Sequence, residues 1–95
     1  MAMGKTMVDI KGITTDYHRI LTSEQDFTIG QEAIRLKIAS YTSAEYRTLE
    51  KGDSISRVVS SNEYILPIVD EDFTRENLYN RIMAEISDFA ESIMV

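Results

Sequence analysis

A histidine and a nearby carboxylate are the first residues whose types and spacing could support chemistry. His18 is the only histidine in the chain, and Asp16 precedes it by two residues. Residues two apart in a strand point to the same face, so these two side chains could form an acid/base pair or part of a metal site. No serine lies in the Gly-x-Ser-x-Gly pattern of a nucleophile elbow, although a Ser/His/Asp triad is formally available. A histidine in a strand is more often structural, and we therefore expect a protein that is not an enzyme.

Two further short motifs point to ligands but lack essential parts. Gly4-Lys5-Thr6 is like the end of a phosphate-binding loop, but the first glycine of such a loop has no place before it. Asp70-Glu71-Asp72 lacks the alternating oxygen ligands and the central glycine of a calcium loop. We expect no metal, no cofactor and no small-molecule substrate.

Length and composition restrict the class of protein. The chain has 95 residues, 43% of them apolar, and no cysteine. These values predict one domain spanning residues 1–95, stabilised by packing or by self-association rather than by disulfides. No stretch has the length of a membrane span, and residues 1–12 lack the apolar core of a signal peptide. We expect a cytoplasmic protein, or one of a particle assembled in the cytoplasm.

Charge is distributed unevenly along the chain. Residues 1–58 contain eight basic and eight acidic side chains, whereas residues 59–95 contain two basic and eight acidic ones. The second part therefore carries the whole net charge of −6. Proteins that bind nucleic acid use Lys and Arg to neutralise phosphates, so direct binding to DNA or RNA is disfavoured.

The clearest predicted element is an amphipathic helix over residues 75–93. Its apolar side chains recur with helical spacing and share one face: Leu78, Tyr79, Ile82, Met83, Ile86, Phe89, Ala90 and Ile93. Thr74 is the expected N-cap, and Phe73 could pack on Leu78 as a hydrophobic staple. Acidic residues in the C-terminal half, with no basic residue after Arg81, oppose the helix dipole.

Alternation and β-branched residues predict strands before that helix. The expected strands cover residues 6–11, 17–22, 33–41, 55–60 and 63–69. Ser60-Ser61-Asn62 could form a hairpin turn, and Pro67 favours an edge strand or a bulge. Residues 43–52 could form a short helix, with Ser43 as N-cap and Gly52 after its end, or an ordered loop. The fold class is therefore α+β, a mainly antiparallel sheet of four to five strands covered on one face by the C-terminal helix.

The apolar residues Ile93, Met94 and Val95 favour self-association. A helix that already covers the sheet leaves little core to bury them, and the far sheet face could expose Tyr17, Leu21, Ala39 and Tyr41. We expect a dimer or larger homo-oligomer with residues 93–95 or the open sheet face in the contact. Alternatively, residues 93–95 fold back over the sheet edge of their own subunit.

Three stretches also carry a resemblance to a group of known proteins. They are Ile38-Ala39-Ser40-Tyr41-Thr42-Ser43-Ala44-Glu45-Tyr46-Arg47, then Tyr64-Ile65-Leu66-Pro67-Ile68, and a helix from Asn77-Leu78-Tyr79 to Asp88-Phe89-Ala90-Glu91-Ser92. Over residues 33–95 the chain resembles small proteins encoded in bacteriophage and prophage genomes, in particular short reading frames that travel with tail and structural genes. The resemblance carries no catalytic residues across. It implies a phage setting, in the host cytoplasm or associated with the virion.

Two functions follow from these observations. The first is a non-catalytic protein-binding module of phage type, a structural or assembly component that binds to itself. The alternative is a small acidic inhibitor of a host protein that mimics nucleic acid in a basic groove. Its binding residues would be the acidic side chains of the C-terminal part: Asp70, Glu71, Asp72, Glu76, Glu85, Asp88 and Glu91.

Overall fold

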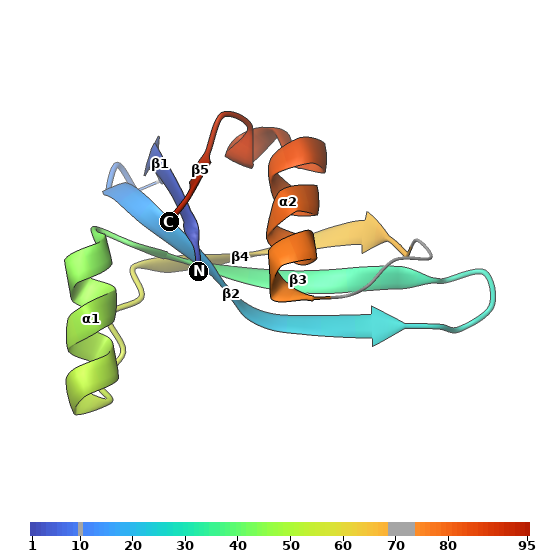
Figure 1. The fold of residues 1–95 in the computed structure, drawn as a ribbon, viewed down its shortest axis with the longest axis horizontal. Coiled ribbons are helices and arrows are strands. Elements are labelled where there is room, and N and C mark those ends of the chain that lie inside the picture. Colours follow the sequence, from blue (N-terminus) through green and yellow to red (C-terminus); the bar gives the residue numbers. More distant parts are fainter. Residues whose placement is uncertain (10, 69–73) are drawn as a thin grey trace.

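A five-stranded antiparallel sheet and two α-helices make up the fold (Figure 1). The computed structural model describes residues 1–9, 11–68 and 74–95. The elements follow the order β1 (Met3–Val8), β2 (Thr14–Asp26), β3 (Ala33–Tyr41), α1 (Ala44–Asp53), β4 (Ser60–Pro67), α2 (Arg75–Glu85), the 3-10 turn η1 (Ser87–Phe89) and β5 (Ile93–Met94). In the sheet the strands lie in the order β4-β3-β2-β1-β5. The predicted α+β class is confirmed.

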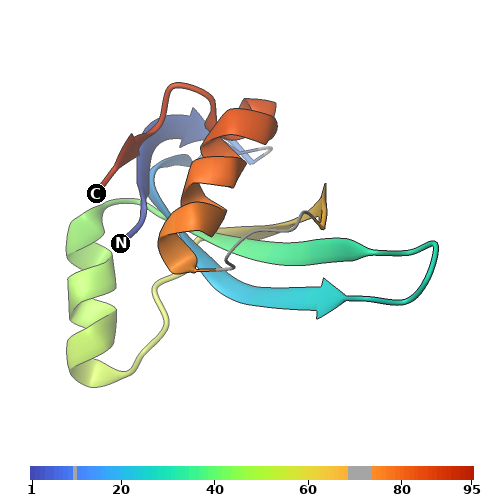
Figure 2. The same cartoon turned by 45° about the vertical axis from the view of Figure 1, so that its right-hand side comes forward.

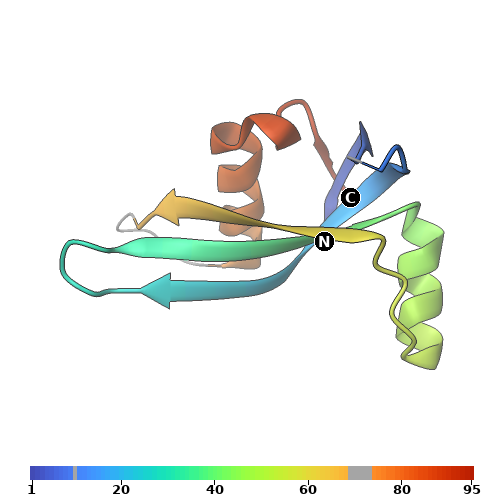
Figure 3. The same ribbon diagram turned by 180° about the vertical axis from the view of Figure 1, so that it is seen from behind.

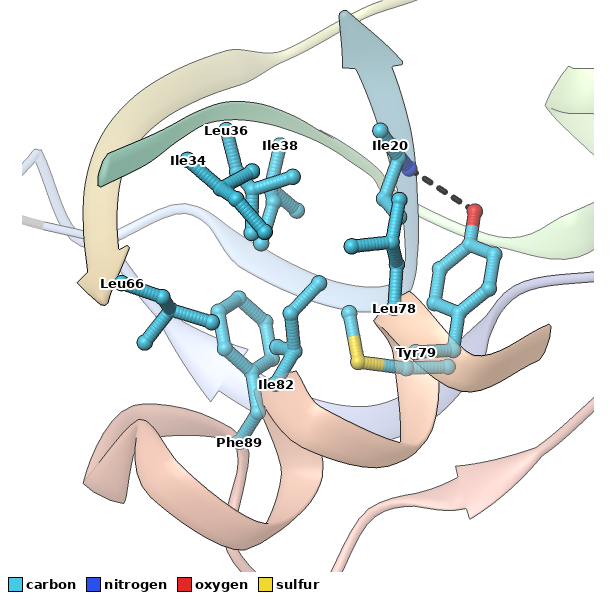
Figure 4. Close-up of a cluster of buried hydrophobic side chains, with 10 residues drawn as sticks. Ile20, Ile34, Leu36, Ile38, Leu66, Leu78, Tyr79, Ile82 and Phe89 are labelled. Carbon is cyan, nitrogen blue, oxygen red and sulfur yellow. Dashed lines mark hydrogen bonds between the residues drawn. The ribbon is translucent and has the colours of Figure 1, made fainter. Parts of the chain in front are cut away.

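The main core lies between one face of the sheet and α2. Ile34, Leu36 and Ile38 alternate along β3 and are buried, whereas Arg35 and Lys37 between them are exposed, as the sequence pattern predicts. Figure 4 shows these three side chains pointing toward α2, with further apolar side chains around them: Ile20, Leu66, Leu78, Tyr79, Ile82 and Phe89. The helix that covers the sheet is therefore part of the core.

Helix α2 begins as predicted and ends earlier than predicted. The Thr74 hydroxyl accepts a hydrogen bond from the Asn77 backbone N–H at 3.2 Å, which confirms the N-cap. Phe73, the proposed staple residue, lies outside the described residues. The helix ends at Glu85 and not near Ile93, so the second half of the predicted helix is wrong.

The chain after Glu85 turns back toward the sheet. Phe89 in the 3-10 turn is 2% exposed and packs edge-on against His18, and Glu91 adopts a left-handed conformation with φ 68°. Ile93 and Met94 then pair with Gly4 and Met3 of β1. The chain thus pairs with the edge of β1 instead of continuing as a helix. This change occurs in the part where acidic side chains oppose the helix dipole.

The predicted strands differ in their agreement with the structure. The strand over residues 33–41 is confirmed, and residues 17–22 lie within the longer β2. The strand predicted over residues 6–11 is displaced, because β1 ends at Val8. The Asp9 carboxylate then accepts hydrogen bonds from the N–H groups of Lys11 and Ile13, which forms a turn.

The hairpin predicted at residues 60–62 is wrong, and so is the strand over residues 55–60. Ser60, Ser61 and Asn62 belong to β4, where they pair with Ser40, Ala39 and Ile38. Of residues 55–60 only Ser60 lies in a strand, because the Arg57 side chain binds Asp53 and the Ile55 carbonyl and holds this segment as a loop. Among the predicted residues 63–69, β4 includes those up to Pro67, and Val69 lies outside the described residues. Pro67 does lie on an edge strand, as expected.

Residues 44–53 form helix α1, on the side of the sheet opposite to α2 (Figures 1 and 3). Ser43 occupies the N-cap position without a side-chain capping bond. Ser54, rather than Gly52, adopts the left-handed conformation after the helix, with φ 60°. Ala39 and Tyr41 on this face are fully buried, so the expectation that they lie on an open sheet face is wrong.

In the parts of the chain that the structure describes, neither helix has the length and apolar character needed to span a membrane.

Candidate functional site

His18 occupies a buried position where three strands meet. Its Nδ1 lies 2.7 Å from the Ser40 Oγ of β3, and its Nε2 lies 2.8 Å from the Lys5 carbonyl oxygen of β1. The Lys5 carbonyl can only accept, so Nε2 carries the proton and Nδ1 accepts from the Ser40 hydroxyl. Burial lowers the pKa of His18 below its usual 6.5, against opposing effects of the Lys5 carbonyl and Asp16. The imidazole is therefore neutral near pH 7.

This arrangement differs from the acid/base pair that the sequence could have provided. Asp16 is exposed whereas His18 is 0% exposed, and both ring nitrogens are occupied by Ser40 and Lys5. Ser40 and His18 have the contact of a nucleophile and its base, but Ser40 is only 6% exposed within a regular strand. The pair instead satisfies two buried polar side chains and fastens β1 to β3 across β2.

A groove of about 630 Å³ lies above Ser40, between the β1–β2 turn and the start of β4. Its walls combine apolar Met7, Val8 and Val59 with polar side chains such as Tyr64 and Asp88. The Tyr64 hydroxyl donates to the Asp88 carboxylate at 3.1 Å, which closes the end of the groove beside Phe89. In the described part of the chain, no three His, Asp or Glu side chains are grouped so that they could hold a metal ion.

A second polar cluster connects α1 to the sheet through Glu50. The Glu50 carboxylate accepts hydrogen bonds from the Tyr41 hydroxyl and from Arg47, both at 2.7 Å, and from the Arg57 backbone N–H at 2.8 Å. Desolvation acts to raise the pKa of Glu50, but these donors outweigh it and lower the pKa below its ordinary value. Arg19 donates to the Tyr41 hydroxyl at 3.1 Å. Glu50 therefore stays ionised and positions α1.

Beside this cluster lies a hollow of about 530 Å³, which we call the α1 hollow. It lies between α1, the following loop and the sheet face opposite α2. Its apolar lining comes from Leu21 and Val58, and its cations are Lys37 and Arg47. Arg47 forms an ion pair with Glu50 at 2.7 Å, so the charge left in the lining of the hollow is the positive charge of Lys37.

Of the predicted acidic binding residues that the structure describes, Glu76 and Glu85 lie in α2, and Asp88 and Glu91 lie beyond its end. Glu76 is exposed on α2, Glu85 pairs with Arg81 at 2.9 Å, and Asp88 accepts from Tyr64. Glu91 is exposed in the turn before β5, beyond the end of the helix. Asp70, Glu71 and Asp72 lie outside the described residues.

Residues 93–95 adopt the fold-back arrangement that the sequence left open. The Ala2 N–H donates to the Val95 carbonyl at 2.8 Å, and the Val95 N–H donates to the Ala2 carbonyl at 2.9 Å. Their side chains nevertheless stay accessible, with exposed fractions of 64% for Ile93, 37% for Met94 and 51% for Val95. Folding back therefore uses the backbone of this segment and leaves its apolar side chains available.

Sequence reasoning missed the tip of the β2–β3 hairpin. Figure 2 shows this hairpin extending well beyond α2. Phe27 and Ile29 at its tip are 62% and 94% exposed. The signal was two large apolar residues next to Gly30, in a segment read only as a break between strands.

Comparison with known proteins adds no family: no protein-family model, no curated protein and no solved structure matches this chain.

Proposed function

We propose that this protein is a non-catalytic binding module that associates with itself through β5, as a structural or assembly component. The observation that supports it most is the open sheet edge at β5, where Ile93, Met94 and Val95 are exposed. Unpaired strand edges with apolar side chains are templates for pairing with another chain. The phage setting implied by the resemblance stays a prediction.

The two edges of the sheet differ in a way that favours β5 as the contact. On β4, the Glu63 charge and Pro67 discourage pairing, and Arg81 donates to the Pro67 carbonyl at 2.7 Å. Ile93 and Met94 are uncharged, and both are exposed among the described residues. A second copy would therefore add at β5 rather than at β4.

The seating of β5 on β1 makes this edge well defined. A Cβ atom on Gly4 would lie 3.3 Å from the Ile93 and Val95 side chains, so those two side chains pack directly over the glycine. Met94 pairs with Met3 and projects toward the opposite face of the sheet. Two copies related by a twofold axis would place their β5 strands antiparallel and bury apolar side chains on both faces.

Light scattering of the full chain tests this proposal. We expect a mass of at least twice the 10.8 kDa of one chain, and a lower mass for Ile93→Asp than for wild type. Ile65→Asp is the matched control, because Ile65 is 67% exposed on the other edge strand, and it should leave the dimer intact. A wild-type mass of 10.8 kDa at high micromolar concentration, or dissociation by both variants, would contradict association through β5.

The acidic-inhibitor alternative has less support from the side-chain geometry. Glu85 and Asp88 already bind Arg81 and Tyr64 within the chain, and Asp88 and Glu91 lie beyond the end of α2. A nucleic-acid mimic should also lose its partner steeply with rising salt, whereas an apolar β5 contact should not.

A further inference from the structure

The tip of the β2–β3 hairpin presents two apolar side chains that the core does not use. Ile29 is 94% exposed, the largest exposed fraction of any large apolar side chain among the described residues. Phe27, two residues earlier, is 62% exposed. Two exposed apolar side chains at the end of a projecting hairpin are typical of a surface that inserts into a partner.

Hydrogen bonds hold the tip in one conformation before any partner binds. The Thr28 N–H donates to the Asp26 carboxylate at 2.9 Å, and the Gln31 N–H donates to the Thr28 carbonyl at 2.8 Å. Gly30 has φ 82°, a value that suits glycine, and its N–H donates to Glu32 at 3.1 Å. A tip fixed in this way loses little conformational entropy on binding.

The charges beside the tip are negative. The hydrogen bonds from Thr28 lower the pKa of Asp26, which keeps this carboxylate ionised. Glu32 lies on the other side of Phe27 and Ile29, so an acidic side chain precedes and another follows the apolar pair. A partner surface that suits this tip is an apolar hollow with basic groups at its rim.

The α1 hollow on the same molecule has that character. Leu21 and Val58 supply apolar lining, and Lys37 supplies positive charge, because Arg47 is already paired with Glu50. The hairpin tip lies at one end of the molecule and α1 lies at the other, along an axis of 40 Å (Figure 1). One copy therefore cannot bring its tip into its own hollow, whereas a second copy can.

We propose that the hairpin tip of one copy inserts Phe27 and Ile29 into the α1 hollow of another copy. The inference extends the proposed self-association, but it uses residues other than β5. Because the two surfaces differ, each copy in such a pair retains a free tip or a free hollow, and further copies can add. A head-to-tail contact of this kind forms a ring or an open row, whereas the β5 contact alone stops at a dimer.

Cysteine cross-linking tests the contact directly, because the natural chain contains no cysteine. Ile29→Cys and Ser56→Cys place one thiol on the tip and one in the lining of the hollow. Mixed and oxidised in air, the two variants should give at least about tenfold more heterodimer than Ile29→Cys with Ser87→Cys, since bound thiols react at high effective concentration. Ser87 is an exposed serine outside the hollow and serves as the matched control.

The outcome separates this contact from the one at β5. Equal yields with Ser56→Cys and Ser87→Cys, or mainly tip-to-tip disulfides, would overturn the head-to-tail contact while leaving the light-scattering result for Ile93→Asp unaffected. The cross-link could also form selectively while light scattering shows no association through β5. That result would support the head-to-tail contact and contradict the β5 contact. Ile29→Asp should abolish any species larger than the β5 dimer, and raising the salt from about 0.05 M to about 0.5 M should weaken the same species by screening its rim charges.

Discussion

The Tyr79 hydroxyl of α2 accepts a hydrogen bond of 2.8 Å from the backbone N–H of Ile20 in β2. The pairing between β2 and β3 changes register between Ile20 and Thr22, so this N–H lies at an irregular point of the sheet. Tyr79 is 1% exposed, and Figure 4 shows its ring beside Ile20 with the bond drawn as a dashed line. The helix therefore completes the hydrogen bonding of the strand that it covers.

Replacing Tyr79 by Phe should lower the free energy of unfolding by about 1–3 kcal/mol, because the Ile20 N–H would be buried without an acceptor. Tyr64→Phe removes a hydroxyl that bonds the exposed Asp88 carboxylate, and it should cost less than about 1 kcal/mol. Urea denaturation of both variants measures the difference. Equal losses would show that the Ile20 N–H finds another acceptor.

The core was the most predictable part of the fold. The alternation of Ile34, Leu36 and Ile38 and the helical spacing around Ile82 each depend on local sequence, and both patterns survive in the structure. The end of α2 and the position of β4 depend on pairing with distant strands. No local pattern records that Ile93 pairs with Gly4, or that Ser60 pairs with Ser40.

Ile82→Ala should reduce the free energy of unfolding by about 2–5 kcal/mol, because Ile82 is 0% exposed at the centre of the core. Ile86→Ala should cost less, since Ile86 is only partly buried after the end of α2. The exposed Ile65 provides a control, and its replacement by Ala should change stability by less than about 0.5 kcal/mol. A loss within about 0.5 kcal/mol for Ile82→Ala would mean that α2 is not needed for the fold.

The candidate site was less predictable than the core. His18 and Asp16 are close in sequence, yet the partners of the imidazole are Ser40 and the Lys5 carbonyl from two other strands. The α1 hollow likewise combines Leu21, Lys37 and Val58, which only the folded sheet brings together. Exposure of Phe27 and Ile29 is also a property of the folded hairpin, because the same residues would suit a buried strand.

Stability should fall as the pH drops below 6.5, because burial holds the pKa of His18 in the folded chain below that usual value. The unfolded chain then binds a proton that the folded chain rejects, so the contribution of neutral His18 is complete above pH 6.5 and is lost toward lower pH. Urea titrations between about pH 7.5 and about pH 5.5 should show a smaller slope for His18→Gln than for wild type. Identical slopes would count against a buried neutral imidazole.

His18→Ala should leave any binding activity intact where the variant stays folded.

Stability should also fall at alkaline pH through Tyr64. Its burial, together with the nearby Asp88 carboxylate, raises the pKa of Tyr64 from 10.0 to about 12. Between these two values the unfolded chain has lost the phenol proton and the folded chain keeps it, so stability is complete below pH 10.0 and declines toward pH 12. Tyr64→Phe should decline less steeply over this window. Ultraviolet absorbance of phenolate checks the pKa itself, and ionisation of all five tyrosines near pH 10 would contradict the prediction.

The end of α1 gives the sharpest test of a sequence prediction that was wrong. Gly52 lies within the helix, its φ is not positive, and a Cβ atom there would meet nothing within 4 Å. Gly52→Ala should therefore stabilise the protein by about 0.5–1 kcal/mol, through the better helix propensity of alanine. Ser54 adopts the left-handed conformation instead, so Ser54→Ala should not stabilise the protein. Ser54→Gly should relieve the backbone strain at this position. The greater conformational freedom of glycine in the unfolded chain should partly offset that gain. Had the helix ended with a left-handed Gly52, the alanine there would destabilise by about 1 kcal/mol, and thermal or urea unfolding distinguishes the two signs.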